Sequence, residues 1–91
     1  MIFHRNIRVK GVVQGVFFRA SARDTAMSLG ITGFVRNEHD GSVYIEAEGE
    51  EEALMKFLAW CKVGPPRAAV SNVEVTDGAP RGFKGFVITR G

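Results

Sequence analysis

The sequence predicts an α+β fold in which two helices cover one face of a largely antiparallel sheet. Segments with alternating apolar and polar residues, typical of half-buried strands, are interrupted by two segments with apolar residues at helical spacing. An Asp-Gly pair between two of the alternating segments is a strong hairpin signal. The resulting order is strand, helix, strand, strand, helix and strand, followed by one further extended piece.

The first half of the chain predicts a strand, a glycine-containing loop and a helix. In residues 3–10, Phe3, Ile7 and Val9 face one way and mostly polar residues face the other, which predicts a half-buried strand. Apolar residues then recur at helical spacing up to the stop signal at Gly30. These helical residues are Phe18, Ala22, Ala26 and Leu29.

The second half predicts a hairpin, a second helix and two extended segments. Residues 33–37 lead to the turn at 40–41, and residues 43–48 alternate after it. Glutamates 50–52 suit the N-terminus of a helix, which ends at the Gly-Pro-Pro of 64–66. Its apolar stripe consists of Leu54, Phe57, Leu58 and Cys61. Alternation around Val73 and Val75 predicts another strand, and a last extended piece runs over residues 83–89. This order fits a ferredoxin-like βαββαβ sandwich with an additional C-terminal strand.

Length and composition indicate one small globular domain over residues 1–91. The chain is 45% hydrophobic and 24% charged, an ordinary balance that argues against disorder. Its net charge of +2 favours small anionic ligands without requiring nucleic acid. A single cysteine, Cys61, excludes an internal disulfide and suits a reducing compartment. No apolar run is long enough to span a membrane, so we expect a cytoplasmic protein, and its size and strand patterns suit a monomer.

The stretch from Gly11 to Arg19 has the features of an anion-binding loop. Its two glycines allow successive N–H groups to point into one concavity, and the following helix start adds unpaired N–H groups. Arg19 would supply a guanidinium fork for two oxygens of a phosphate or carboxylate. A plain tight turn with a solvated arginine fits the same spacing. The loop is neither a Walker loop nor a Rossmann fingerprint, because it lacks the Gly-Lys-Ser/Thr of the first and the third glycine of the second. In the predicted fold this loop approaches the end of the second strand, so Arg19 and Asn37 are expected to border one site.

Two segments resemble the signatures of the acylphosphatase family. Residues 9–19 (VKGVVQGVFFR) are similar to the first signature, in which Val-Gln-Gly-Val is followed, after two further residues, by arginine. Residues 33–37 (GFVRN), followed by Gly41, Val43 and Gly49, are similar to the second. The resemblance covers nearly the whole chain, including the order of elements. Phe17 stands at a variable position where many members have glycine.

The resemblance implies hydrolysis of acyl phosphates to a carboxylate and inorganic phosphate, with no metal or cofactor. Carried over by position, Arg19 would bind the phosphoryl oxygens and Asn37 would orient the attacking water. The backbone N–H groups of Val13, Gln14, Gly15 and Val16 would complete the phosphate cradle. The expected partners are therefore the small-molecule substrate and phosphate, without nucleic acid or membrane.

Three other reactive side chains receive structural interpretations from the sequence. His4 falls on the polar side of the first strand and is expected to be solvated, and His39 is expected to be exposed in the hairpin turn. Cys61 lies on the apolar stripe and is expected to pack in the core. These three residues do not have the spacing of metal ligands.

Two binding functions compete with the hydrolase prediction. RNA-recognition domains share the βαββαβ order, but the predicted central strands offer mainly Tyr44 as an aromatic platform, which argues against RNA binding. A regulatory module that binds a small anion without turning it over stays open as the alternative. Asn37 beside the anion cradle favours catalysis.

Overall fold

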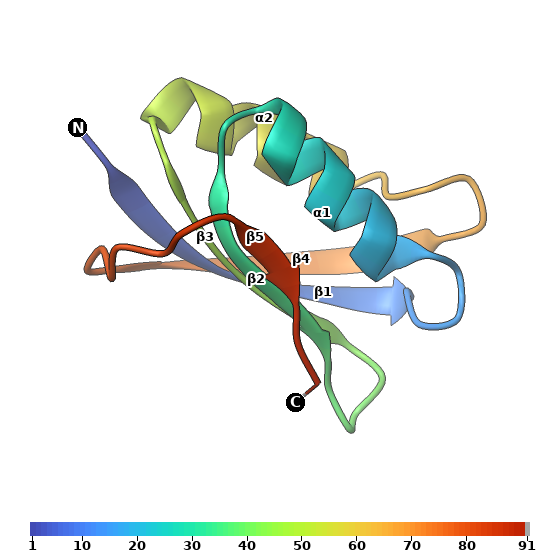
Figure 1. The fold of residues 1–91 in the computed structure, drawn as a ribbon. Helices are drawn as coiled ribbons and strands as arrows, with labels where there is room; N and C mark the ends of the chain where they lie inside the picture. The colour runs from blue at the N-terminus through green and yellow to red at the C-terminus, as the bar shows by residue number, and fades with distance from the viewer. Residues whose placement is uncertain (91) are drawn as a thin grey trace.

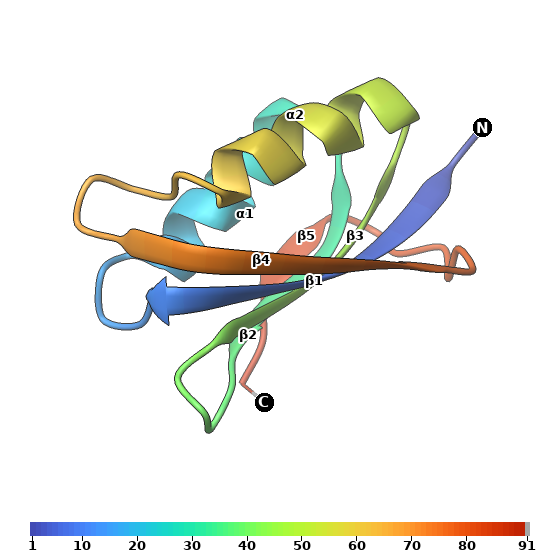
Figure 2. The same cartoon turned by 180° about the vertical axis from the view of Figure 1, so that it is seen from behind.

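A computed structural model describes residues 1–90 of the chain. Five strands form one sheet in the order β4-β1-β3-β2-β5, and both views of the ribbon show α1 and α2 on the same side of it (Figures 1 and 2). The elements are β1 (Phe3–Val12), α1 (Phe18–Ser28), β2 (Thr32–Asn37), β3 (Val43–Gly49), α2 (Glu51–Cys61), β4 (Ala69–Gly78) and β5 (Phe86–Ile88). The predicted ferredoxin-like βαββαβ arrangement with an additional strand is confirmed. Neither helix is long and apolar enough to cross a membrane.

The pairing of the strands brings the ends of β1 and β2 to the same end of the sheet. β1 runs antiparallel to β3 and β4, β2 runs antiparallel to β3, and β5 joins β2 in parallel. Val43 of β3 lies opposite Val9 in β1 and opposite Asn37 in β2. The loop after β1 therefore starts beside the point where β2 ends.

The core lies between the helices and one face of the sheet. Alternate residues of β1, β2 and β3 point into it, and they meet the apolar stripes of the two helices. Its largest fully buried side chains include Ile7, Val35, Ile45, Phe18 and Phe57, and burying each such side chain contributes about 1.5–3 kcal/mol. Cys61 is fully buried among them, as predicted.

The last two strands, β4 and β5, differ in length from the segments that the sequence predicts. β4 extends over ten residues because it pairs with β1 along its whole length, although most of its side chains are exposed at the edge of the sheet. β5 is only three residues long, because Gly82 and Gly85 have positive φ and break the extended chain before it. Phe83, which the sequence pattern places in the extended piece, instead packs against His4 and Phe34.

The expectation that His4 is solvated is wrong. Its side chain is 3% exposed, with Nδ1 at 2.6 Å from Glu48 Oε2 and Nε2 at 2.9 Å from Asn6 Oδ1. The segment between β4 and β5 folds back over this position, and the backbone N–H groups of Arg81, Gly82 and Phe83 all donate to the Glu48 carboxylate. The alternation of β1 identified the correct face of the sheet, but it contained no sign that a later loop covers that face.

Candidate active site

A bulge at the end of β1 turns the chain into the loop that precedes α1. The register between β1 and β4 shifts at Lys10/Gly11, and Gly11 has a φ of 126°. A Cβ at Gly11 would lie 2.2 Å from the carbonyl oxygen of Ala69, so only glycine fits there. Gly15 also has a positive φ, 73°, but with open space around it, so its requirement is backbone conformation alone.

The loop and the start of α1 present N–H groups that have no partner within the described chain. Across residues 1–90, no backbone N–H of residues 14–17 donates a hydrogen bond. The N-cap residue of α1, Phe17, provides no side-chain cap, and no acidic residue lies in the first turn. Unpaired N–H groups at a helix N-terminus attract anions because they combine free donors with the positive end of the helix dipole.

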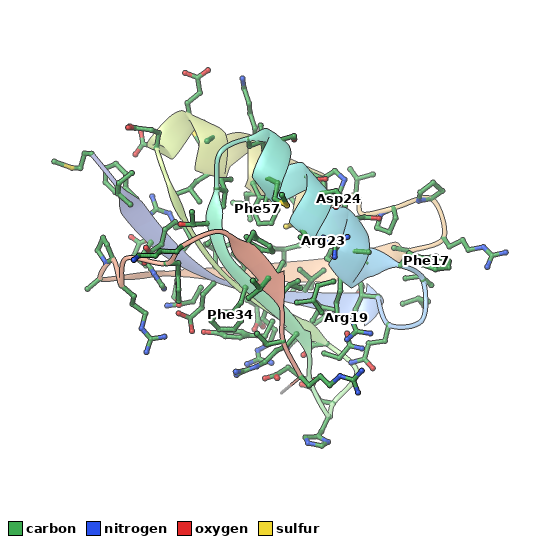
Figure 3. All side chains as sticks on the ribbon, in the orientation of Figure 1. Phe17, Arg19, Arg23, Asp24, Phe34 and Phe57 are labelled. Carbon is green, nitrogen blue, oxygen red and sulfur yellow. The ribbon has the colours of Figure 1, made fainter. Side chains whose placement is uncertain are left out.

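Arg19 projects from the first turn of α1, between the loop and the β2–β3 hairpin (Figure 3). It is half-buried, and none of the ion pairs found among residues 1–90 includes it. Arg23, one turn further along the helix, instead pairs with Asp24 at 3.2 Å. The helix therefore carries one neutralised arginine and one whose charge is available at the loop.

Asn37, the last residue of β2, has a buried side-chain oxygen without a partner. In the described part of the chain, its Oδ1 is the one buried side-chain nitrogen or oxygen atom that lacks a hydrogen bond. Such an atom costs about 1–3 kcal/mol when nothing satisfies it. It therefore marks a position where a water or ligand completes the hydrogen bonding.

The side chain of Gln14 joins the loop to the hairpin that carries Asn37. Its Nε2 donates to the carbonyl oxygens of Glu38 (2.8 Å) and Ser42 (2.9 Å). The hairpin is itself held by Asp40, which accepts hydrogen bonds from the hydroxyl and N–H of Ser42, and these bonds lower the pKa of Asp40. The sequence predicted only a backbone role for Gln14. The available signal was a lone amide side chain between Val13 and Gly15 in a loop.

One cavity of about 560 Å³ brings the principal predicted residues together. Arg19 and Asn37 both line it, as do Val13 and Gly15 of the predicted cradle, whereas Gln14 and Val16 are not among its lining residues. Val16 packs against the core instead. The full lining consists of Val13, Gly15, Phe17, Phe18, Arg19, Ala20, Asn37, Ile88 and Arg90. It contains no carboxylate, so its field is positive, which favours an anionic ligand.

Sequence reasoning missed four lining residues, two of them in α1 (Phe18 and Ala20). The other two, Ile88 and Arg90, lie far from the loop in the chain. They reach the cavity because β5 pairs with β2 and the chain continues alongside it, with Thr89 N–H donating to Val35 O at 2.9 Å. Both ribbon views show this C-terminal segment running towards the β2–β3 turn (Figures 1 and 2). A parallel pairing between segments more than fifty residues apart leaves no local trace in the sequence.

The other reactive side chains lie outside this cavity. His39 is exposed in the hairpin turn, as predicted. Cys61 is buried, and burial raises the pKa of its thiol to about 12, which suppresses the thiolate. No cluster of His, Cys, Asp or Glu suited to a metal ion occurs within residues 1–90.

The face of the sheet opposite the helices carries aromatic rings that are already stacked by arginines. The Arg36 guanidinium lies 5.6 Å from the ring of Phe34 and 4.9 Å from that of Tyr44. Arg8 lies 5.2 Å from the same tyrosine ring, and both arginines pair with Glu38. These side chains form an internally paired layer, separated by the sheet from Phe57 and the helices (Figure 3).

Comparison with known proteins agrees with this geometry. The family model described as Acylphosphatase matches residues 5–88. An acylphosphatase from Thermotoga maritima is 52% identical over 82 residues, which cover 90% of this chain and 91% of the relative. The structure of an acylphosphatase from Coxiella burnetii superposes with a TM-score of 0.94 at 39% identity, covering 97% of this chain and 93% of the other. An acylphosphatase from Bacillus subtilis gives the same TM-score at 38% identity, covering 98% and 99%. The chain therefore belongs to the acylphosphatase family of hydrolases.

Proposed function

We propose that the chain hydrolyses acyl phosphates by in-line attack of a water that Asn37 orients, on a phosphoryl group held by Arg19 and the loop N–H groups. One observation carries the proposal. A single cavity joins unpaired N–H groups, an arginine without an acidic partner and a buried amide oxygen without a hydrogen bond. In the protein alone these N–H groups, this guanidinium and this amide oxygen have no partner. Each of them gains one when a phosphoryl group and a water enter the cavity.

The phosphoryl group binds where positive charge is already fixed. The N–H groups of residues 13–16 and the guanidinium of Arg19 contact its equatorial oxygens, which carry most of the charge in the transition state. These donors do not need to reorganise as the charge develops, and one donor of this kind typically contributes on the order of 10²–10³ in rate.

Asn37 positions the nucleophile. Its amide accepts from and donates to a water, and holds it in line with the bond to the leaving group. The water oxygen forms a bond to phosphorus, the bond between phosphorus and the acyl oxygen breaks, and the carboxylate leaves with the electron pair. A carboxylic acid has a pKa of about 4, so the leaving group needs no proton. A phosphoryl oxygen accepts the proton that the water loses, since no carboxylate or histidine lines the cavity.

The direct test is hydrolysis of benzoyl phosphate with a chelator present. We expect release of benzoate and phosphate above the spontaneous rate. No hydrolysis above background would overturn the proposal. Binding of inorganic phosphate without hydrolysis would identify the alternative, a module that binds small anions.

Two substitutions separate the proposed roles. Asn37→Ala should lower kcat about 10²-fold or more and leave inhibition by phosphate largely intact, because the amide acts on the water. Arg19→Ala should weaken both turnover and phosphate inhibition. Arg23→Ala removes an equal charge one turn away and Asn72→Ala removes an exposed amide on β4, so these variants are the matched controls. Equal phosphate affinity in the wild type and Arg19→Ala would contradict the role of the arginine.

A further inference from the structure

Besides Phe18 and Ala20 of α1, three lining residues of the cavity have no task in holding the phosphoryl group. Phe17 lies in the loop before α1, Ile88 ends β5 and Arg90 follows it. Phe17 is 73% exposed and Ile88 36% exposed, so neither is there to build the core. The cavity volume of about 560 Å³ is in the range of sites for whole organic ligands, and far more than a phosphate ion fills.

Phe17 is unfavourable in both conformation and exposure. It has φ 64° and ψ 24°, and it is the one non-glycine residue with positive φ in the described chain. A bulky side chain is a genuine outlier in the left-handed region, and its ring gains little from packing because it points outward (Figure 3). Strain of this kind concentrates at ligand sites, and Phe17 lines the cavity, where its exposed ring is available to a ligand.

Arg90 brings a second unpaired positive charge to the same cavity. The pairing of β5 with β2 and the hydrogen bond from Thr89 to Val35 hold the chain just before it. Across residues 1–90, none of the ion pairs contains Arg90, and no acidic residue lines the cavity. The cavity thus holds two available guanidinium groups, while one phosphoryl group engages only Arg19 and the loop.

We propose that Phe17, Ile88 and Arg90 form a subsite for the acyl group that favours acyl phosphates with an apolar body and a second anionic group. Phe17 and Ile88 contact the apolar body, and Arg90 pairs with the second anion. This inference rests on the proposed function, because it takes the phosphoryl group to occupy the loop and Arg19. The favoured substrates therefore carry negative charge in two places, on the phosphoryl group and at the far end of the acyl group.

The charge preference is tested with benzoyl phosphate and its 3- and 4-carboxy derivatives. The quantity measured is the ratio of kcat/KM for the better carboxybenzoyl phosphate to kcat/KM for benzoyl phosphate. Arg90→Gln should lower this ratio about threefold to tenfold, equivalent to about 0.7–1.4 kcal/mol for a partly solvated ion pair. Arg67→Gln, an exposed arginine outside the cavity, is the matched control and should leave the ratio unchanged. An unchanged ratio in Arg90→Gln would overturn the role of Arg90.

The apolar preference is tested with benzoyl and acetyl phosphate. Phe17→Gly should lower the ratio of kcat/KM for benzoyl phosphate to that for acetyl phosphate about fivefold, and it should not lower the thermal midpoint, because glycine relieves the strained φ. An equal change for both substrates would mean that Phe17 shapes the loop and not the acyl subsite.

A binding measurement separates failure of this subsite from failure of the proposed function. Carboxybenzylphosphonate and benzylphosphonate resemble the substrates but have no cleavable acyl–phosphate bond. We expect the carboxylated compound to bind wild type more tightly, and Arg90→Gln to lose that advantage. If the wild type hydrolyses no acyl phosphate but shows this preference, the subsite stands and the catalytic proposal fails. If it hydrolyses benzoyl phosphate but shows no preference in either assay, the subsite fails alone.

Discussion

Glu48→Gln should destabilise the fold strongly, although it changes one oxygen to a nitrogen. Oε2 of Glu48 accepts from His4 and from the N–H of Arg81, and Oε1 accepts from the N–H groups of Gly82 and Phe83. The side chain is 2% exposed. Glutamine has only one oxygen, so in either orientation its NH₂ group faces donors that previously had an acceptor.

The magnitude follows from this arrangement. Each hydrogen bond to a charged group contributes about 1.5–3 kcal/mol, and at least two are lost. His4 can recover part of the loss by changing its tautomer, whereas the backbone N–H groups cannot adapt. We therefore expect the free energy of unfolding to fall by about 3 kcal/mol, a large fraction of the total for a domain of this size.

Urea unfolding at neutral pH measures this loss as a lower midpoint with an unchanged slope. The matched control is Glu74→Gln, which makes the same chemical change on the same sheet. Glu74 pairs with Lys10 at 3.2 Å, but the two side chains are about half exposed, so this variant should lose less than about 1 kcal/mol. A loss below about 1 kcal/mol in Glu48→Gln, or equal losses in the two variants, would refute the reasoning.

Four further outcomes are expected. Burial alone raises the pKa of Glu48, but the hydrogen bonds from His4, Arg81, Phe83 and Gly82 outweigh it and hold that pKa below 4.5. The stabilisation by Glu48 is therefore fully present well above the unfolded-state pKa of 4.5 and is lost as the pH falls through the lower folded-state pKa. As the pH falls below 4.5, urea midpoints should fall further in wild type than in Glu48→Gln, and parallel curves would argue against this. Cys61 should resist a disulfide reagent at pH 8 in the folded protein and react rapidly in denaturant, because burial raises its pKa to about 12; fast labelling without denaturant would contradict its packing. Gln14→Met removes both bonds from the loop to the hairpin and should lower kcat/KM for benzoyl phosphate about tenfold through mispositioning of Asn37, which steady-state kinetics would measure and an unchanged value would exclude. Asn37→Leu removes the buried oxygen without a partner and should raise the free energy of unfolding by about 1 kcal/mol while abolishing turnover; a destabilised variant would mean that the amide has a structural role.

Local pattern predicted most of the fold because most of its elements bury one face. The alternation in residues 3–10 and 43–48 and the helical stripe of Leu54, Phe57 and Cys61 correspond to buried positions in β1, β3 and α2. The alternation around Val73 and Val75 underestimates the length of β4, because the exposed parts of an edge strand need no apolar face. The burial of His4 and the arrival of Arg90 at the cavity were not predicted. Both depend on the chain after β4, which folds across one end of the sheet and then pairs with β2.

The two ends of β1 differ in how their polar groups are satisfied, and this difference separates structure from function. Near its start, His4 and Glu48 are buried with every available partner supplied by the protein, including three backbone N–H groups. At its other end the loop N–H groups, Arg19 and the buried oxygen of Asn37 face one cavity without such partners. Burial of polar groups is costly in both places, but only the first cost is offset within the fold. A fold that can supply three N–H groups to one carboxylate is able to satisfy its polar atoms. The groups left unsatisfied around the cavity are therefore best explained by a ligand that satisfies them, and the charge of the lining requires that ligand to be an anion.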